Sequence, residues 1–515
     1  MTDIRSAPLD RKQLGHLRHI RNLSAQPDND WSNMAAARPM QEDFGAYRYQ
    51  LAYMFLALAL THRHRLPAAP GVFQPVMDRL IQKMLLPEVW SYWRDTSAGG
   101  NPDYPDMPQP TQSIDPIAAM NIMYSGYLHA MTLMYHYLFD DPKYTEQGAI
   151  SFRMRPLFWG GEGEGYRFDY DEKSLNDRIY WQMAQSGFLG IACEPGMIFQ
   201  ICNQVPIIGF RMHDFLYGTT LSSDVTLAYQ QAWEDFGTLT EDGHYNTMIL
   251  DWRREVVPGQ LGPDIVPRLP VWDAWCGTLM HSWNGDFVEN QYRHGIEAFI
   301  ERRGNAEIAI RVNDAVLGDS VAPEHGPTTL CHFGFLATWA AEVGDDVVRD
   351  GLLETADRTM CPTWRDGGLF YPRDDRPVDE DGNYRFMDPL TGNALLAFAR
   401  LCPPGGLKSL YEDRWKGERF AQPALRTVNA GIDVCEARFD PATNCLRFTL
   451  APPHSTAAGE VDIGIGPFDP GVDRAALCAG LTDDTIRAQC EGENAIRLIG
   501  RIGRARTFEM RVPHA

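Results

Sequence analysis

The stretch AYRYQLAYMFLALAL, residues 46–60, decides the fold class of this chain. Its apolar side chains recur on the period of an α-helix. The run is too short to cross a membrane, because a span needs about 20 apolar residues, and it ends in the polar residues Thr61 to Arg65. The first 23 residues contain no apolar core of an export signal. We therefore expect a buried helix in a cytoplasmic protein that is not inserted in a membrane.

Helical periodicity continues on the C-terminal side of this stretch, in segments joined by long loops rich in proline and glycine. Helices are predicted at 75–93, 117–139, 174–185, 195–216, 228–236, 290–302, 331–342 and 392–401, with a strand-like patch at 166–170. From residue 433 the pattern becomes alternating, as in DVCEARF and CLRFTL on either side of a turn. This organisation predicts a mainly α protein: an α/α toroid over residues 1–425 and a small β-sandwich over 426–515.

Composition and motifs exclude several functions. Among the 515 residues, 68 are acidic and 47 basic, and a net charge of −21 should repel nucleic acids. The chain contains no phosphate-binding loop, Rossmann glycine pattern, HExxH or GxSxG motif. Its 10 cysteines include no CxxC pair, so neither a zinc finger nor a dithiol redox motif is predicted. Most of them are expected to be reduced core residues.

The segment from residue 187 to 219 contains the most informative thiols. Pro195 suits the first position of a helix, which would place Glu194 at its cap and Cys193 just before it. A thiol there feels the positive end of the helix dipole, which favours the thiolate. Cys202 would then lie two turns inside the helix. A second interpretation makes both cysteines ordinary core residues.

Two further helices carry tyrosines at helical spacing. Met123 and Tyr127 are four residues apart and share one face, as do Tyr49 and Tyr53. Tyrosine hydroxyls in an apolar wall can exchange a proton with a substrate, and the rings can stabilise a nearby cation. Packing alone would also explain both pairs.

Together, ACEPGMIFQICN (192–203), NIMYSGYL (121–128) and the helix with Arg48 and Tyr49 resemble the linalool dehydratase-isomerase family. The resemblance extends more weakly through FGFLATWAAEVGD (333–345) and covers most of residues 40–400, without the C-terminal β region. It implies an (α/α)6 barrel that forms ring-shaped homo-oligomers and needs no cofactor or metal. It also implies a small apolar substrate, because the family dehydrates a tertiary allylic terpene alcohol and isomerises it to the primary alcohol.

The resemblance also assigns individual residues. The two pocket cysteines of the family match Cys193 and Cys202, its pocket tyrosine matches Tyr49, and its pocket methionine matches Met123. The catalytic histidine of the family falls at Tyr127, and His129, two positions on, is not its equivalent. An aspartate and a tyrosine supplied by the neighbouring subunit have no clear counterpart here. These departures predict a substrate other than linalool.

We therefore predict acid–base chemistry on an alkenyl or terpenoid alcohol. Cys193 is the candidate acid and base, with Glu194 beside it, and Cys202 is either a partner base or a nucleophile that forms a thioether. Tyr127 would donate a proton, with Tyr49 nearby. Weaker substrate-binding candidates are Tyr53, Trp272, Tyr371 and Asp388. For the last two, an equally good interpretation is a loop stabilised by Arg–Asp pairs.

Two other function classes remain open. A helical toroid followed by a β-sandwich also describes polysaccharide lyases and several glycosidases, in which Trp90, Trp93, Trp272 and Trp275 would stack sugars. Paired carboxylates in an open groove would favour that class. The third class is a non-catalytic isoprenoid-binding protein, which would bind a terpenoid without turnover.

Overall fold

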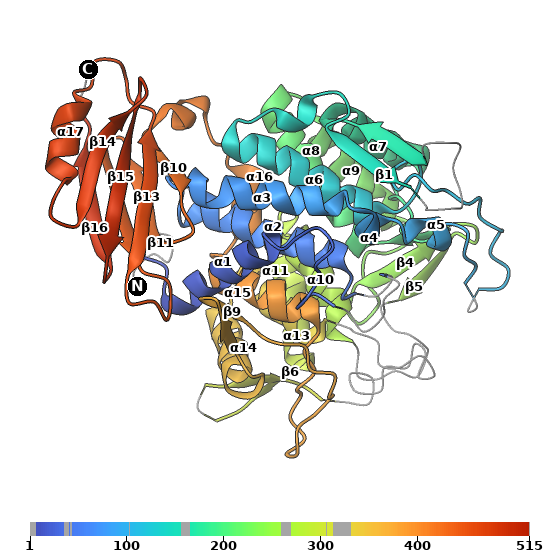
Figure 1. The fold of residues 1–515 in the computed structure, drawn as a ribbon. Helices are drawn as coiled ribbons and strands as arrows, with labels where there is room; N and C mark the ends of the chain where they lie inside the picture. The colour runs from blue at the N-terminus through green and yellow to red at the C-terminus, as the bar shows by residue number, and fades with distance from the viewer. Residues whose placement is uncertain are drawn as a thin grey trace.

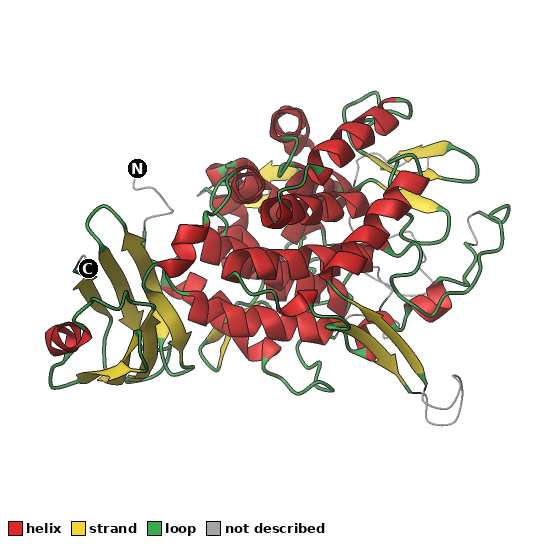
Figure 2. Cartoon of the chain, turned by 90° about the horizontal axis from the view of Figure 1, so that it is seen from above, coloured by secondary structure: helices red, strands yellow, loops and turns green. Residues whose placement is uncertain are grey.

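Six of the described helices contact one another in a closed ring. Figures 1 and 2 show the helices packed into one body, with strands at its edges. The computed structural model describes residues 7–35, 41, 44–101, 104–155, 165–258, 269–304, 306–312 and 331–513. In chain order the ring contains α2 (Tyr47–His64), α6 (Ile122–Phe139), α8 (Gln204–Tyr217), α10 (Pro270–Met280), α13 (His332–Val343) and α15 (Leu396–Leu401). Each helix contacts the next, and α15 contacts α2.

A second set of helices packs outside the ring and alternates with the first along the chain. It comprises α1 (Arg11–Ser24), α3 (Pro70–Met84), α7 (Glu172–Gln185), α9 (Leu221–Glu234), α11 (Gly285–Gly295) and α14 (Asp346–Thr359). Helix α1 packs on α15, and each of the others packs on the ring helix that precedes it in the chain. Short helices fill the connections: α4 (Pro87–Trp90), α5 (Trp93–Thr96) and α16 (Gly406–Glu412).

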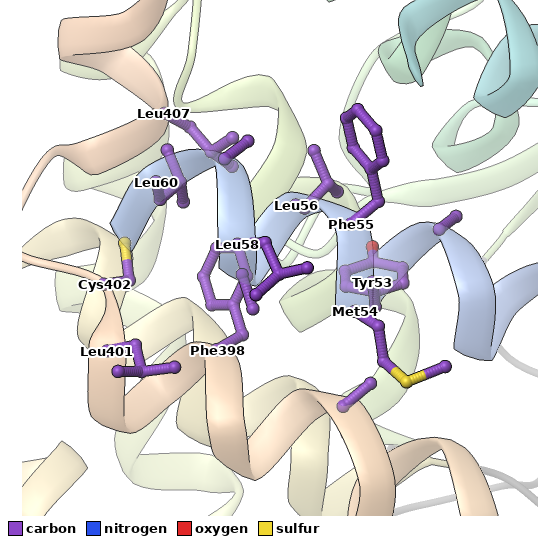
Figure 3. Close-up of a cluster of buried hydrophobic side chains, with 14 of the residues drawn as sticks. Tyr53, Met54, Phe55, Leu56, Leu58, Leu60, Phe398, Leu401, Cys402 and Leu407 are labelled. Carbon is purple, nitrogen blue, oxygen red and sulfur yellow. The ribbon is translucent and has the colours of Figure 1, made fainter. Parts of the chain in front are cut away.

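Helix α2 lies at the centre of the helical body. Every side chain from Arg48 to His62 is buried, as expected for a helix that is apolar on nearly all sides. Figure 3 shows Tyr53, Met54, Phe55, Leu56, Leu58 and Leu60 of this helix beside Phe398, Leu401, Cys402 and Leu407 from the C-terminal helices. The helix predicted at 46–60 is confirmed. Among the described helices, none combines the length and the apolar character that a membrane span requires.

In the described part of the chain, four small antiparallel sheets lie in the connections between the helices. Three of them are pairs: β1 (Ile150–Met154) with β2 (Tyr166–Tyr170), β6 (Ile300–Arg302) with β7 (Ile308–Ile310), and β8 (Thr363–Arg365) with β9 (Gly368–Phe370). In the fourth, β4 (Asn246–Leu250) lies between β3 (Met197–Phe199) and β5 (Glu255–Pro258). The strand-like patch at 166–170 is confirmed as β2.

Three helix predictions need correction. Residues 75–93 divide among α3, α4 and α5, because Pro87 begins a new helix. The prediction at 290–302 continued too far, since α11 ends at Gly295 and the chain then forms a 3₁₀ turn and β6. Residues 195–216 begin not with a helix but with a turn and β3, followed by a 3₁₀ turn at Ile201–Asn203 and only then by α8.

The C-terminal region contains two antiparallel sheets. One has the strand order β10 (Ala424–Val428), β13 (Gly459–Gly466), β15 (Ala495–Ile502), β14 (Ile486–Glu491). The other has β11 (Asp433–Asp440), β12 (Cys445–Ala451) and β16 (Arg506–Arg511). Helix α17 (Arg474–Leu481) packs on β14. The hairpin predicted on either side of residues 440–444 is confirmed, and Figure 1 shows this region at one end of the helical body.

An apolar seam joins the C-terminal strands to the helices. Leu17 of α1, Leu58 of α2 and Val76 of α3 face Ile432 and Val434 across a cavity of about 30 Å³. At Gly71 the first turn of α3 comes so close to β10 that a Cβ atom would lie 2.5 Å from the backbone of Arg426. The two regions are therefore packed against each other without space for a larger side chain at that point.

Candidate active site

An aromatic cluster forms where the first two turns of four ring helices meet. Tyr49 and Tyr53 of α2 contact Tyr127 of α6 edge-to-face, with ring centroids 6.1 and 5.9 Å apart. Trp275 of α10 lies 5.4 Å from the Tyr49 ring and stacks on Phe335 of α13 at 4.3 Å. All five side chains are buried. The N-terminal ends of these helices therefore lie at the same end of the ring.

Cys193 lies in a chain segment that folds back on itself. Glu194, Pro195, Gly196 and Met197 form a turn in which the Met197 N–H donates to the Glu194 carbonyl at 3.0 Å. Gly196 has φ +73°, so Pro–Gly here is the centre of a type II turn and not the start of a helix. The Cys193 N–H donates to the Met197 carbonyl at 2.9 Å, which closes the loop. The predicted position of Cys193 at the start of its own helix is therefore wrong.

Cys193 instead faces the start of a different helix, α6. The Asn121 N–H donates to the Cys193 carbonyl at 3.2 Å, and the Ile122 N–H donates to the Ala192 carbonyl at 3.4 Å. The side chain of Asn121 does not cap the helix, and the Met123 N–H interacts with the Cys193 thiol. The sulfur thus occupies the place of a capping side chain, where the helix dipole favours negative charge.

Cys202 lies beside Cys193 and donates a thiol hydrogen bond to it. It belongs to the 3₁₀ turn Ile201–Asn203 that leads into α8, so it is in the first helical turn of this segment and not two turns inside. Both thiols are buried. The structure therefore brings the two predicted cysteines together at the N-terminal ends of α6 and α8.

The two thiols differ in acidity. The hydrogen bond from Cys202 lowers the pKa of Cys193, but burial and the Glu194 carboxylate outweigh it, so the pKa is raised overall. Burial and the Cys193 sulfur raise the pKa of Cys202 much further. Both groups are thiols near neutral pH, and Cys193 is the one that loses its proton more easily.

Arg48 contributes a buried positive charge next to this pair. Its guanidinium lies over the Tyr49 ring at 4.4 Å and over the Tyr92 ring at 4.2 Å, and it donates to the Tyr49 hydroxyl at 3.2 Å. The Tyr92 hydroxyl donates to the Asn121 side chain at 2.6 Å. Burial lowers the pKa of Arg48, but Tyr49, Tyr92 and Cys193 together raise it, so the side chain stays charged.

Tyr127 points its hydroxyl toward the indole of Trp275, which donates to it at 3.4 Å. Burial raises the pKa of the Tyr127 phenol well above its ordinary value. Burial also raises the pKa of the Tyr53 phenol, and the neighbouring Tyr127 adds to this rise. Both phenols are therefore neutral near pH 7 and can donate a proton or a hydrogen bond, but cannot hold an abstracted proton.

Three other predicted residues lie at or near the cluster. Glu194 is part of the turn after Cys193, close enough for its charge to raise the pKa of both cysteines. Met123 supplies its backbone N–H to Cys193. Trp272 contacts Phe44 edge-to-face at 5.7 Å, and Phe44 makes the same contact with Trp275. The catalytic and binding roles of these residues remain predictions.

Tyr371 and Asp388 are not in contact with the cysteine pair. The Tyr371 hydroxyl donates to Asp357 and accepts a hydrogen bond from Arg400 at 2.9 Å, which is the Arg–Asp arrangement that competed with its predicted role. The Asp388 carboxylate accepts hydrogen bonds from the backbone and the hydroxyl of Thr391, so it caps the helical segment before α15. Its second contact is the Cys331 thiol.

Three residues of this site, Arg48, Tyr92 and Trp275, were not predicted as site residues, and the residue pattern contains only partial signs of them. Arg48 stands in the quoted family motif, yet a charged residue in an apolar helix gave no sign of its stacking partners. Tyr92 lies in a segment predicted as continuous helix. The sequence suggests Trp275 only for sugar stacking. Trp90, Trp93 and Trp275 are all completely buried, so none of them lines an open groove for a sugar chain. Within the described ranges, no three His, Cys, Asp or Glu side chains are grouped as a metal ion would require.

Comparison with solved structures finds helical hydrolases at low similarity. An unsaturated glucuronyl hydrolase specific for heparin is 9% identical, with a TM-score of 0.42 over 76% of this chain and 96% of that one. An α-1,6-mannanase from Salegentibacter sp. HEL1_6 is 12% identical, with a TM-score of 0.39 over 78% and 100%. An unsaturated glucuronyl hydrolase from Bacillus sp. GL1 is 11% identical, with a TM-score of 0.41 over 76% and 96%.

The sequence itself matches one family model, described as linalool dehydratase/isomerase, over residues 48–377. The match covers more than half of the chain and includes Arg48, Tyr127, both clustered cysteines and Trp275. The protein is therefore an enzyme that belongs to the linalool dehydratase/isomerase family.

Proposed function

We propose that the protein dehydrates, and by re-addition of water isomerises, an apolar alkenyl alcohol of the terpenoid class. The observation that carries this proposal is the pair of buried, hydrogen-bonded thiols Cys193 and Cys202 beside an aromatic wall. Loss of water from an allylic or tertiary alcohol needs an acid, a base and a dry, electron-rich environment for positive charge. The cysteines would supply the first two, and the rings of Tyr53, Tyr127 and Trp275 would supply the third.

In this reaction Cys193 acts first as the acid. Its proton passes to the hydroxyl oxygen of the substrate, the C–O bond breaks with its electron pair on oxygen, and water leaves. The thiolate left on Cys193 is stabilised by the hydrogen bond from Cys202 and by the Met123 N–H. It then takes a proton from the neighbouring carbon, and the C–H electron pair forms the new double bond. Cys193 ends protonated, so protons balance over the cycle.

Cys202 serves this mechanism as a hydrogen-bond donor. Its pKa is raised well above the ordinary value, so its thiolate is scarce near neutral pH and covalent attack through a thioether is disfavoured. Tyr127 would bind the departing oxygen, because its neutral phenol donates where the family has a histidine. Adding water at the other end of the allylic system by the reverse steps would give the isomeric alcohol.

The wall of the site supports an apolar substrate that develops positive charge. One face of the Tyr49 ring is already covered by the Arg48 guanidinium, so that face is closed to a substrate cation. Among the described residues no guanidinium lies over the rings of Tyr53, Tyr127 or Trp275, although Phe335 stacks on one face of Trp275. Substrate charge should therefore develop on their side of the site.

The architecture supports the same assignment. We propose that the closed ring of six helices, with six more alternating outside it, is an (α/α)6 toroid. By the same family resemblance we propose that the enzyme is a homo-oligomer that works without a metal ion or cofactor.

The test is turnover of a panel of tertiary and primary allylic alcohols, including linalool and geraniol, with products separated by gas chromatography. We expect diene or isomeric alcohol from at least one terpenoid, and activity that persists with a chelator. Cys193→Ala and Cys202→Ala should be inactive, and Cys276→Ala is the matched control, because this buried thiol instead contacts Gln200. Binding of the alcohols without product would reject the proposal in favour of a binding protein.

A further inference from the structure

Arg48 is a buried cation that no described carboxylate neutralises. Its side chain is 2% exposed, and in the part of the chain that the structure describes no Asp or Glu forms an ion pair with it. Its Nη1 and Nη2 atoms donate to the Gln41 carbonyl and the Tyr49 hydroxyl, and among the described residues its Nε has no partner. A charge removed from water without a counter-charge is strongly destabilising. An acidic group beside it would therefore be stabilised by this charge whenever it loses its proton.

Arg48 is connected to Cys193 through packed groups. It stacks on Tyr92, the Tyr92 hydroxyl bonds the Asn121 side chain, and the Asn121 N–H donates to the Cys193 carbonyl. The influence is also electrostatic and mutual, because the Arg48 charge lowers the pKa of Cys193 while Cys193 raises that of Arg48. Arg48 also lowers the pKa of Cys202, but it is the smallest of the named contributions to that pKa.

We propose that Arg48 is a positioning residue whose guanidinium is the counter-charge of the Cys193 thiolate, formed when that thiol gives up its proton. The role of Arg48 in the reaction rests on the proposed function. It makes Cys193, and not Cys202, the acid of the pair. The positive charge is kept off the substrate side of the site by the Tyr49 ring.

The other groups facing Cys193 fit this assignment. Glu194 opposes the thiolate, Cys202 donates a hydrogen bond to it, and the Met123 N–H favours it. Tyr49 and Tyr92 are buried phenols whose pKa is raised, so neither carries charge. Arg48 is the formal positive charge among the main groups that act on Cys193.

The experiment follows the ionisation of Cys193 without any substrate, from the ultraviolet absorbance of its thiolate against pH. The contribution of Cys193 is the difference between each protein and its Cys193→Ser counterpart. We expect Arg48→Met to move this ionisation upward by about one pH unit or more, and Arg48→Lys, which keeps the charge, to move it much less. Arg400→Met removes another largely buried arginine, one that bonds Tyr371 and Asp357, and should leave the ionisation unchanged.

An unchanged Cys193 ionisation in a folded Arg48→Met protein would overturn the proposal. If Arg48→Met fails to fold, Arg48→Gln keeps a donor for the Gln41 carbonyl and makes the same test. A folded Arg48→Lys protein that shifts as far as the neutral variants would also overturn it, since charge would then not be the cause. Because no substrate is used, the result does not depend on whether the proposed dehydration is correct.

Discussion

Replacing Tyr127 by phenylalanine removes one oxygen atom from the centre of the site and leaves the ring in place. The edge contacts with Tyr49 and Tyr53 remain, but the Trp275 N–H loses its acceptor at 3.4 Å. Such a long hydrogen bond places the stability loss near the low end of the range for an unpaired buried donor, about 1 kcal/mol. For a chain of this size the melting temperature should fall by only about 2 °C.

The expected effect on turnover is larger. A positioned hydrogen-bond donor to the departing oxygen contributes about 10²-fold or more, which corresponds to about 2.7 kcal/mol of activation free energy. The assay is the initial rate of alcohol dehydration by gas chromatography, together with a thermal melt of the same sample. Tyr124→Phe is the control, because Tyr124 lies on the same helix, is equally buried, and donates to the Met84 carbonyl at 2.6 Å outside the cluster. It should lose similar stability and little activity.

Full activity in Tyr127→Phe would refute the reasoning, and Tyr127 would then be a packing residue. A second variant, Tyr127→His, tests whether this position selects the substrate. It restores the side chain that the family resemblance expects there, so we expect a gain of weak activity on linalool relative to the parent protein. No such gain, in a protein that melts normally, would mean that this position does not select the substrate.

Four further outcomes are expected. Cys193→Ala should abolish turnover while lowering the unfolding free energy by only roughly 1–2 kcal/mol in a denaturant titration; residual turnover would remove Cys193 as the acid. The raised pKa of Cys193 keeps it protonated at neutral pH, so the rate should fall only as pH rises above the ordinary thiol range, and a decline already present near pH 7 would contradict this. Burial lowers the pKa of His129 and of His332 to about 3, so their contribution to stability is complete above pH 6.5 and is lost as pH falls toward 3. In His332→Leu, the urea concentration at the unfolding midpoint should therefore decrease less between pH 6.5 and pH 3 than in the parent protein. Gly209→Ala would place a Cβ 2.3 Å from the His129 ring, so it should destabilise the α6–α8 contact by about 1–3 kcal/mol, measurable by thermal melting.

Most ring helices were predictable because their apolar pattern is long, but α10 (Pro270–Met280), which carries Trp275, was not predicted. In α2 and α13 nearly every side chain is buried, and such helices stand out in a sequence at once. The β-hairpin of β11 and β12 was equally visible, since alternation and a turn occur together. Boundaries were less predictable where the backbone enters the left-handed region, as at Asn121, which delays the start of α6.

The cysteine site was predicted in composition but not in geometry. Pro195 was interpreted as a helix start, although Pro–Gly is also a turn signal, and Gly196 adopts the positive φ that the turn requires. The helix that Cys193 actually faces begins more than 70 residues earlier in the chain. No local pattern reports such a contact. For the same reason the stacking of Arg48 between Tyr49 and Tyr92 could not be inferred from residue spacing.

The apolar seam between α1, α3 and the C-terminal strands has a consequence for how the chain can be divided. The family match ends at residue 377, and the β region begins near 424, which invites expression of the helical part alone. A chain cut just before residue 424 would keep every ring helix, but it would expose Leu58, Val76 and their neighbours to water where Ile432 and Val434 now cover them. Such a truncated chain should aggregate or be degraded in cells, even though every residue of the proposed site is intact. The β region would then be needed to keep the helical part folded and soluble, and not for the chemistry of the site.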